Sequence, residues 1–279
     1  LLCSQLGRRR ALAAFGSALA AFAISCILWA GPLGALHYVE GLRAHAAAER
    51  FVLIQITPAA IAYGLGLPTV IASAIGIASA LGAFTVALAA WRNQLFRPLW
   101  KLAITCALLP FAIPFFHEHD FVVLLLPALL CLTLEDRGTW SLAASGMMLA
   151  SVDWLGLAQR PGAFSQVALL AIAQLCAIFA VADVPLRRMV LPACVLPVVA
   201  GACLLAARFP APVWPDAMRG AVTLTLPVAS VWHEELVRTG QFAVQPAWAL
   251  LRLLTLAGCA LLAWAAFGAA AARDQMERL

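Results

Sequence analysis

Charged side chains are scarce in this sequence. Asp, Glu, Lys and Arg together make up 11% of its 279 residues, whereas about 25% is usual in soluble globular domains. The hydrophobic fraction is 64%, and the mean hydropathy is +0.95. So few polar side chains do not cover the surface of a water-soluble fold of this size. The composition therefore excludes the ordinary soluble classes and indicates that lipid is the solvent.

The sequence also lacks the alternation of apolar and polar residues that marks the strands of a transmembrane barrel. Its apolar runs are continuous, and several reach the roughly 20 residues that a helix needs to cross a bilayer. Because lipid offers no partner to unpaired backbone groups, continuous runs of this kind predict helices. We expect an all-α fold, a polytopic transmembrane helix bundle.

Cysteine pairs, nucleic-acid-binding patches and internal repeats are missing as well. The eight cysteines include no C-x-x-C spacing and mostly lie inside apolar runs, which is typical of small core residues rather than a metal or disulfide framework. The formal net charge is +5, but the basic residues are scattered at the ends of apolar runs, as membrane topology requires. We expect no nucleic-acid partner, and we predict that residues 1–279 form a single transmembrane domain.

Eight runs are predicted to span the membrane, namely residues 11–30, 68–90, 102–116, 121–134, 140–157, 166–184, 189–207 and 248–269. Arg8 to Arg10 precede the first run, so the positive-inside rule places both termini in the cytoplasm. Residues 37–50 are expected to form an outer loop with a short surface helix. Residues 51–66 are too short to span and are expected to be re-entrant or interfacial.

The strongest local signal is the tight turn between two predicted spans, where four titratable residues are consecutive: His117, Glu118, His119 and Asp120. Such residues beside a membrane are costly unless they are hydrated or paired, so they indicate a functional site. Their imidazole and carboxylate groups could exchange protons, orient a sugar hydroxyl or hold a phosphate. The alternative interpretation is an ordinary polar hairpin tip.

A metal site at this turn is not expected. His117 and His119 are two residues apart, a spacing at which side chains converge on a strand but diverge on a helix. The sequence also shows no evident third ligand nearby.

Two charged residues interrupt other predicted spans. Arg252, near the start of the last span, could bind a lipid phosphate through its planar donor fork, or its side chain could extend outward to the headgroups. Asp153, near the outer end of the span over residues 140–157, is either functional or a solvated helix end. The long outer stretch, residues 208–245, contains Trp232 with acidic neighbours and is either a sugar-binding surface or an amphipathic interfacial helix.

Around the titratable turn, the sequence resembles the membrane glycosyltransferases of family 87, a polyprenyl-phosphate-sugar-dependent group with GT-C architecture. Those proteins commonly carry a His-x-Tyr-Asp-like turn that leads into a Leu-rich helix with Pro. His117 and Asp120 match this turn, His119 stands in the place of Tyr, and residues 124–127 continue the pattern. Residues 56–68 also resemble the family's segment before its next span, so the resemblance covers about residues 11–134.

The resemblance implies an enzyme that transfers mannose or a pentose from a polyprenyl-phosphate donor to a lipid or glycan acceptor. The reaction would take place at the outer face of a bacterial plasma membrane. His117 and Asp120 would be catalytic, and Glu118, His119 and Arg252 would bind substrate. No cofactor is expected, and the other partners are membrane lipids.

The chain departs from the family at the catalytic acid. Family members carry it in their first outer loop, before the part that this chain resembles, and no position here matches it. We therefore expect this chain, which begins at Leu1, to be the C-terminal portion of a larger GT-C domain. A multi-span transporter or lipid flippase stays open as an alternative, for which two repeated halves and ionisable residues at mid-membrane are typical, as does a non-catalytic assembly protein.

Overall fold

The computed structural model describes residues 8–134, 136–154, 185–210 and 228–276, with isolated positions between 168 and 179. Every regular element in this part of the chain is a helix, which confirms the all-α prediction. The elements are α2 (Arg8–Glu49), α3 (Pro58–Gly64), α4 (Thr69–Arg92), α5 (Pro98–Ala112), η1 (Glu118–Leu124), α6 (Leu125–Leu132), α7 (Arg137–Trp154), η2 (Leu186–Arg188), α9 (Val190–Ala206), α10 (Val228–Arg238) and α11 (Pro246–Met276).

Three helices are long and apolar enough to cross a membrane: Ala13–Glu49, Thr69–Arg92 and Pro246–Ala272. Two shorter apolar helices, Pro98–Ala112 and Val190–Ala206, overlap the predicted spans over residues 102–116 and 189–207. The predicted span over residues 121–134 is divided into a 3-10 helix and the eight-residue α6. Most of the predicted span over residues 166–184 lies outside the described residues, so the total of eight spans stays a prediction.

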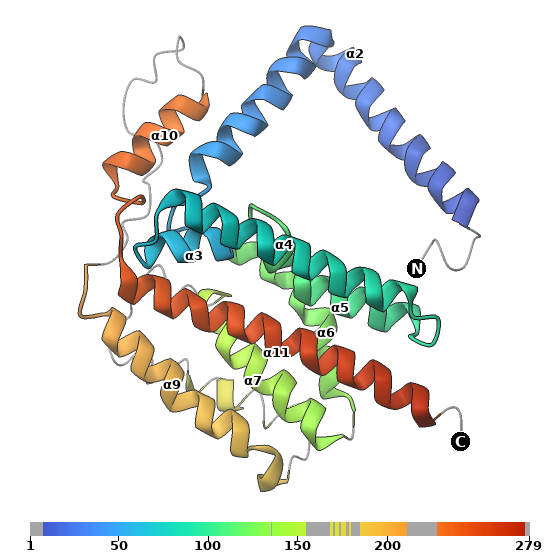
Figure 1. Cartoon of the computed structure of the whole chain (residues 1–279), viewed down its shortest axis with the longest axis vertical. Coiled ribbons are helices and arrows are strands. Elements are labelled where there is room, and N and C mark those ends of the chain that lie inside the picture. Colours follow the sequence, from blue (N-terminus) through green and yellow to red (C-terminus); the bar gives the residue numbers. More distant parts are fainter. Residues whose placement is uncertain are drawn as a thin grey trace.

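The longest helix, α2, bends sharply at Gly31, where the sequence predicted that the first span ends. Gly31 has a φ of 73° and a ψ of 165°, a conformation that side chains other than glycine rarely adopt. Pro32 follows and lacks the N–H that a continuing helix would use. Figure 1 shows the two arms of α2 meeting at this bend.

The second arm of α2 corrects one prediction. Residues 37–50 were expected to be an outer loop with a short helix, but the helix runs from the bend to Glu49. The reason is local, because residues 42–49 consist largely of Leu, Arg, Ala and Glu, which are strong helix formers. This arm contacts α10 and places Glu49 beside the titratable turn, 3.2 Å from His117.

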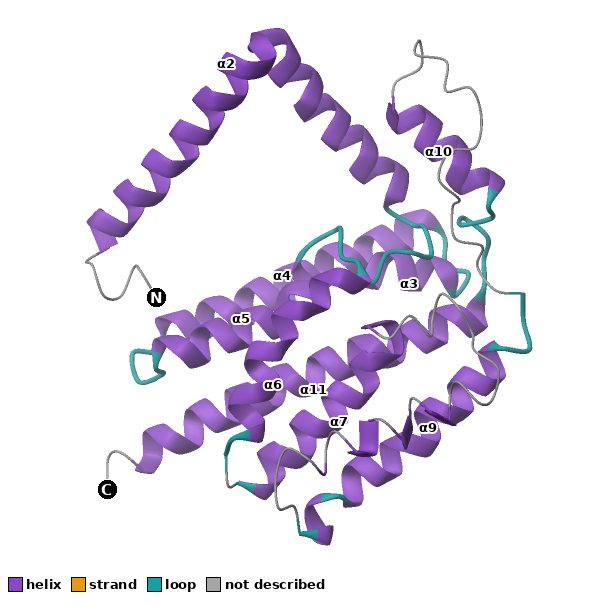
Figure 2. Cartoon of the chain, turned by 180° about the vertical axis from the view of Figure 1, so that it is seen from behind, coloured by secondary structure: helices purple, strands orange, loops and turns teal. Residues whose placement is uncertain are grey.

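The core is built around α11, which packs against α7, α5, α9, α6 and α3. Figures 1 and 2 show α11 running through the bundle between α5 and α7. Large buried side chains fill the space around it, among them Trp100, Phe116, Phe121 and Leu262. By contrast, Trp29 on the first arm of α2 is 92% exposed, as expected for a side chain that faces lipid.

Two glycines set the distance between α7 and α11. A Cβ placed on Gly258 would lie 2.5 Å from the carbonyl oxygen of Gly146, and a Cβ on Gly146 would lie 2.8 Å from that of Gly258. The helices therefore touch backbone to backbone, as small residues allow in membrane bundles. Because Asp153 lies seven positions after Gly146 and Arg252 six positions before Gly258, an antiparallel crossing brings this charged pair together.

The segment between α2 and α3 is buried in protein, although little of it is helical. Its backbone is held by other parts of the chain: Leu53 N–H donates to the Gln241 carbonyl at 3.1 Å, and Ile56 N–H donates to the Phe116 carbonyl at 2.8 Å. Non-helical backbone at membrane depth is tolerated where protein surrounds it. The predicted re-entrant or interfacial placement of residues 51–66 remains a prediction.

Candidate functional site

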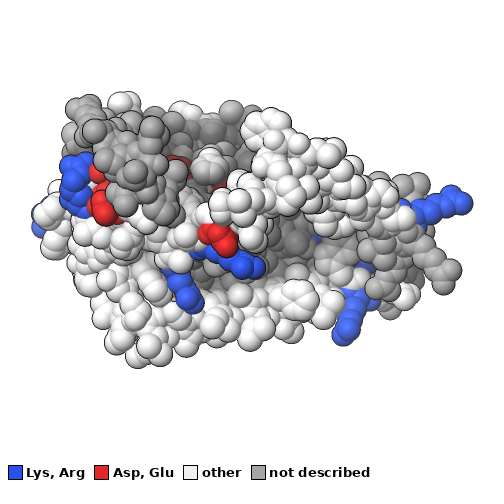
Figure 3. Space-filling view, turned by 90° about the horizontal axis from the view of Figure 1, so that it is seen from above, with Lys and Arg blue, Asp and Glu red and all other residues white. Residues whose placement is uncertain are grey.

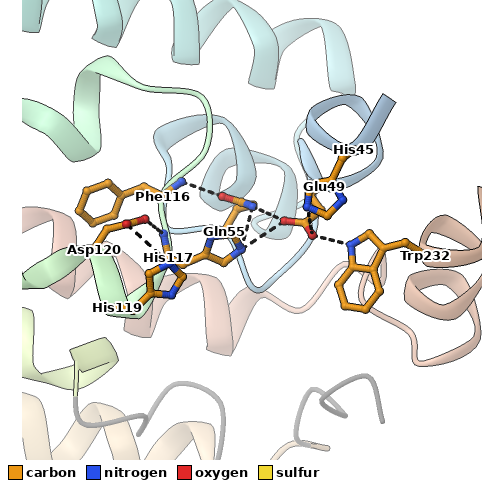
Figure 4. Close-up of polar contacts among 8 residues, drawn as sticks. All are labelled: His45, Glu49, Gln55, Phe116, His117, His119, Asp120 and Trp232. Carbon is orange, nitrogen blue, oxygen red and sulfur yellow. Dashed lines mark hydrogen bonds and ion pairs between the residues drawn. The ribbon is translucent and has the colours of Figure 1, made fainter. Parts of the chain in front are cut away.

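A buried polar network joins the end of α2 to the titratable turn (Figure 4). The Gln55 side-chain NH₂ donates to Oε2 of Glu49 at 2.6 Å, and its Nε2 lies 3.1 Å from Nε2 of His117. His117 Nε2 also lies 3.2 Å from Glu49 Oε2. Glu49 is 2% exposed, Gln55 0% and His117 9%. A carboxylate is costly to bury unless it is paired and hydrogen-bonded, and this network supplies both.

The second carboxylate oxygen of Glu49 has partners of its own. His45, one helical turn earlier, places Nε2 at 3.2 Å from Oε1, and the Trp232 indole N–H of α10 also donates to Oε1. The His45 and Trp232 rings stack at 6.2 Å between centroids. Both oxygens of Glu49 are thus occupied, so this carboxylate orients its neighbours rather than meeting a substrate.

Gln55 fixes the orientation of the network. The backbone N–H of Phe116 donates to Gln55 Oε1 at 2.9 Å, so the amide NH₂ must face Glu49 and His117. Two arrangements of His117 are then possible. Either its Nε2 accepts from Gln55 and Nδ1 carries the proton, or Nε2–H donates to Glu49. Nδ1 is buried and forms no hydrogen bond within the described part of the chain.

The turn itself is shaped by His117 and Asp120. His117 is extended (φ −116°, ψ 174°) and immediately precedes η1. Its backbone N–H donates to Oδ2 of Asp120 at 2.9 Å, while the Asp120 N–H bonds to the His117 carbonyl at 3.1 Å. Because the side chain of Asp120 folds back on the turn, its Oδ1 lies 3.6 Å from Nε2 of His119.

The two histidines converge, contrary to the divergence expected on a helix. Their rings stack with centroids 5.4 Å apart and planes inclined by 13°. His117 lies before the helix in extended backbone, so helical spacing does not apply to the pair. Ligand atoms of His117, His119 and Asp120 lie within 4.8 Å of one another. Asp120 therefore supplies the possible third ligand atom that was not evident in the sequence.

Asp153 and Arg252 form a second, fully buried cluster between α7 and α11. The Arg252 Nε lies 3.4 Å from the Asp153 Oδ1, with the side chains 2% and 0% exposed. This burial rules out both simpler alternatives, a solvated helix end for Asp153 and an outward-reaching side chain for Arg252. Within the described residues, none of the three guanidinium nitrogens has a hydrogen-bond acceptor.

The two clusters lie on neighbouring elements. The 3-10 helix η1, which begins at Glu118, contacts α7, the helix that carries Asp153, while His117 immediately before η1 belongs to the network with Glu49. The structure therefore brings His117, His119 and Asp120 together at the turn. Arg252 belongs to the separate cluster with Asp153.

Sequence reasoning did not assign Glu49, Gln55 and Trp232 to this site. Glu49 was noted only as an outer-loop acid, Gln55 as an interruption of an apolar segment, and Trp232 as part of an outer surface. The one available signal was a polar residue, Gln55, inside an otherwise apolar run. Their meeting depends on separations of 62 residues (Gln55 to His117) and 183 residues (Glu49 to Trp232).

An apolar groove of about 620 Å³ lies along the bundle between α4, α5 and α11. Its lining includes Ala83, Leu108, Phe111, Trp264 and Phe267. The one polar side chain in the lining, Ser79, donates its hydroxyl to the Phe111 carbonyl at 3.1 Å. Figure 3 shows the charged side chains of one face of the molecule in separate groups among uncharged residues. The groove therefore suits an alkyl or isoprenoid chain.

Comparison of the chain with known protein families, curated proteins and solved structures found no match.

Proposed function

We propose that this protein is a multi-pass membrane glycosyltransferase of GT-C type, with about eight spans and both termini in the cytoplasm of a bacterium. It transfers mannose or a pentose from a polyprenyl-phosphate donor to a lipid or glycan acceptor at the outer face of the membrane. One observation carries the proposal: the turn from His117 to Asp120 is held by a buried carboxylate, because His117 Nε2 lies 3.2 Å from Oε2 of Glu49.

The proposed reaction inverts the anomeric carbon. The acceptor hydroxyl oxygen attacks that carbon, the bond to the phosphate oxygen breaks, and the hydroxyl proton passes to the half-buried carboxylate of Asp120. Polyprenyl phosphate leaves with the bonding electron pair. His117, donating through Nδ1–H, and Arg252 stabilise its negative charge. Removing one such preorganised donor typically slows catalysis by about 10²–10³-fold.

Two features of the described chain support a lipid-linked phosphate donor. The Arg252 guanidinium has no hydrogen-bond acceptor among the described residues, and a planar fork of donors matches phosphate oxygens. The groove along α11, which also carries Arg252, accommodates an apolar chain.

Transfer of radiolabelled sugar from polyprenyl-phosphate mannose to membrane lipids tests the proposal, with pentose donors run in parallel. His117→Ala and Asp120→Ala should each lose transfer by at least about 100-fold, at unchanged protein amount in the membrane. The matched control is His37→Ala, since His37 is exposed on α2 away from the turn. Equal transfer by His117→Ala and His37→Ala would overturn the assignment of the site.

Transport or lipid flipping is a second candidate, and one observation favours it. The Asp153–Arg252 pair is an ionisable pair inside the bundle, a feature of transport pathways. Movement of a labelled polyprenyl-phosphate sugar across proteoliposomes that contain the wild-type chain, without covalent transfer, would support this candidate and contradict the transferase.

A further inference from the structure

The turn has an excess of negative charge for a site that is to hold a phosphate. The two clusters contain four carboxylates, those of Glu49, Glu118, Asp120 and Asp153, but only the single guanidinium of Arg252. A phosphate donor would be repelled unless further positive charge is supplied.

We propose that His117, His119 and Asp120 bind a divalent first-row transition-metal ion at the outer end of the bundle. Two imidazoles and one carboxylate with open positions are a recognised ligand set for such ions. This proposal rests on the proposed function in naming the phosphate as the ligand that fills the open positions, and it replaces the roles given there to Asp120 and to the Nδ1–H of His117. The binding itself follows from the geometry of the three side chains.

Each ligand has one atom available for the ion. Asp120 uses Oδ2 to accept from the His117 backbone, which leaves Oδ1 beside His119 Nε2 at 3.6 Å. Neighbouring ligand atoms around such a metal lie about 3 Å apart, given bond lengths of about 2.1 Å. All three ligand atoms lie within 4.8 Å of one another, so binding an ion requires them to move closer, and the 74% exposed His119 side chain has room to rotate.

His117 is prepared for this role by the residues behind it. Its Nε2 faces the Glu49 carboxylate at 3.2 Å, and its buried Nδ1 forms no hydrogen bond within the described chain. When Nε2–H donates to Glu49, Nδ1 presents a lone pair. Metal-binding histidines typically donate their other N–H to a carboxylate in this way, which fixes the tautomer and raises ligand basicity.

The ion changes the roles within the proposed site. Asp120 becomes a ligand, and the acceptor proton passes to its neighbour Glu118. The positive charge of the ion offsets the negative charge of the carboxylates. It also stabilises the phosphate, in addition to the charge of Arg252. The inference thus names a metal requirement that the proposed transferase did not include.

Metal binding is tested on the full chain, purified in detergent with any polyhistidine tag removed. Co²⁺ is the probe, because its visible absorption reports coordination, and Zn²⁺ serves as the competitor. We expect one saturable Co²⁺ site per chain. His119→Ala should weaken binding at least about tenfold, and Glu49→Gln, which leaves all three ligands in place, should weaken it about 10–100-fold.

His37→Ala is the control and should bind Co²⁺ as the wild type does. If Glu49→Gln fails to fold, the His119→Ala variant still decides the test, because the His119 side chain is exposed and its removal should leave the fold intact. Equal affinity in His119→Ala and the wild type, or the absence of a saturable site, would overturn the inference. The Co²⁺ titration contains no sugar donor, so its result does not depend on the transferase proposal. Metal binding by a chain that transfers no sugar would contradict the transferase alone. Sugar transfer by a chain that binds no metal would contradict the metal site alone.

Discussion

Arg252 of α11 and Asp153 of α7 face each other in the interior, with Nε and Oδ1 3.4 Å apart and almost no exposure to solvent. Their meeting depends on the crossing of the two helices at Gly146 and Gly258. A buried ion pair contributes little net stability compared with apolar residues of similar volume. Its presence here favours a functional role for Arg252.

Replacing Arg252 with Met should destabilise the protein strongly. The substitution leaves the Asp153 carboxylate buried without its cation, which typically costs about 3–5 kcal/mol. The double variant Arg252→Met with Asp153→Leu should recover most of this loss, because it removes both charges. Thermal unfolding in detergent measures the difference.

The double variant also separates stability from function. If Arg252 binds phosphate, the recovered protein should still lack sugar transfer. A double variant that is as unstable as Arg252→Met would show that the two charges do not compensate each other.

A methyl group at the helix crossing should separate α7 from α11. Gly258→Ala places its Cβ 2.5 Å from the Gly146 carbonyl oxygen and 2.7 Å from the Ala150 nitrogen, contacts that only a backbone shift can relieve. Overpacking of this kind costs about 1–3 kcal/mol, and we expect a corresponding fall in the midpoint of thermal unfolding.

Gly268→Ala is the matched control on the same helix. A Cβ at Gly268 meets nothing within 4 Å, so its better helix propensity should stabilise the protein by up to about 1 kcal/mol. Equal effects of the two substitutions would contradict the close crossing.

The helical architecture was predictable because its signals are local. Apolar runs of helical length and the Gly31-Pro32 break are visible in the sequence, and the structure places a kink at that break. The continuation of α2 to Glu49 was misjudged because charged residues suggested a loop, whereas a charged arm that contacts α10 remains helical.

The candidate site was only half predictable. The turn was found because consecutive titratable residues interrupt apolar sequence, and Asp153 and Arg252 were each noted for the same reason. Their pairing was not predicted, because it depends on contact between helices far apart in the chain. The sequence left open whether His117 and His119 lie on a strand, where they would converge, or on a helix, where they would diverge, and His117 is extended. The approach of Asp120 to both histidines depends on the fold of the turn, which the spacing does not reveal.

Asp136 should give the N-terminal end of α7 a pH-dependent stability. The pKa of Asp136 is held below its usual range, chiefly because the Thr139 backbone N–H donates to Oδ2 at 2.7 Å, with further contributions from the Thr139 hydroxyl and the charge of Arg188. Because the fold favours the ionised carboxylate, Asp136 stabilises the protein fully at a pH above the usual pKa of a carboxyl group. This contribution is lost as the pH falls through the lowered pKa.

Asp136→Ala should therefore destabilise the protein by about 1 kcal/mol at neutral pH, the usual effect of removing a helix cap. The difference from the wild type should shrink on acidification. Asp136→Asn keeps an acceptor oxygen and should retain most of the stability without the pH dependence. A constant difference across the acidic range would contradict the role of the ionised carboxylate.

Gln55 should be a positioning residue for His117. Gln55→Leu removes the acceptor of the Phe116 N–H and the donor to Glu49, and each buried group left without a partner costs about 1–3 kcal/mol. Because the ring of His117 then loses a contact that fixes its orientation, kcat for sugar transfer should fall more than KM rises.

Tyr63→Phe provides the comparison for Gln55→Leu. It removes one hydrogen bond from the same region, between the Tyr63 hydroxyl and the Phe242 carbonyl at 3.2 Å, without touching the network around His117. We expect a loss of about 1 kcal/mol in stability and an unchanged kcat. If both variants lower kcat in proportion to their loss of stability, Gln55 acts on the fold alone. A fall in kcat confined to Gln55→Leu shows that the amide acts through the orientation of His117.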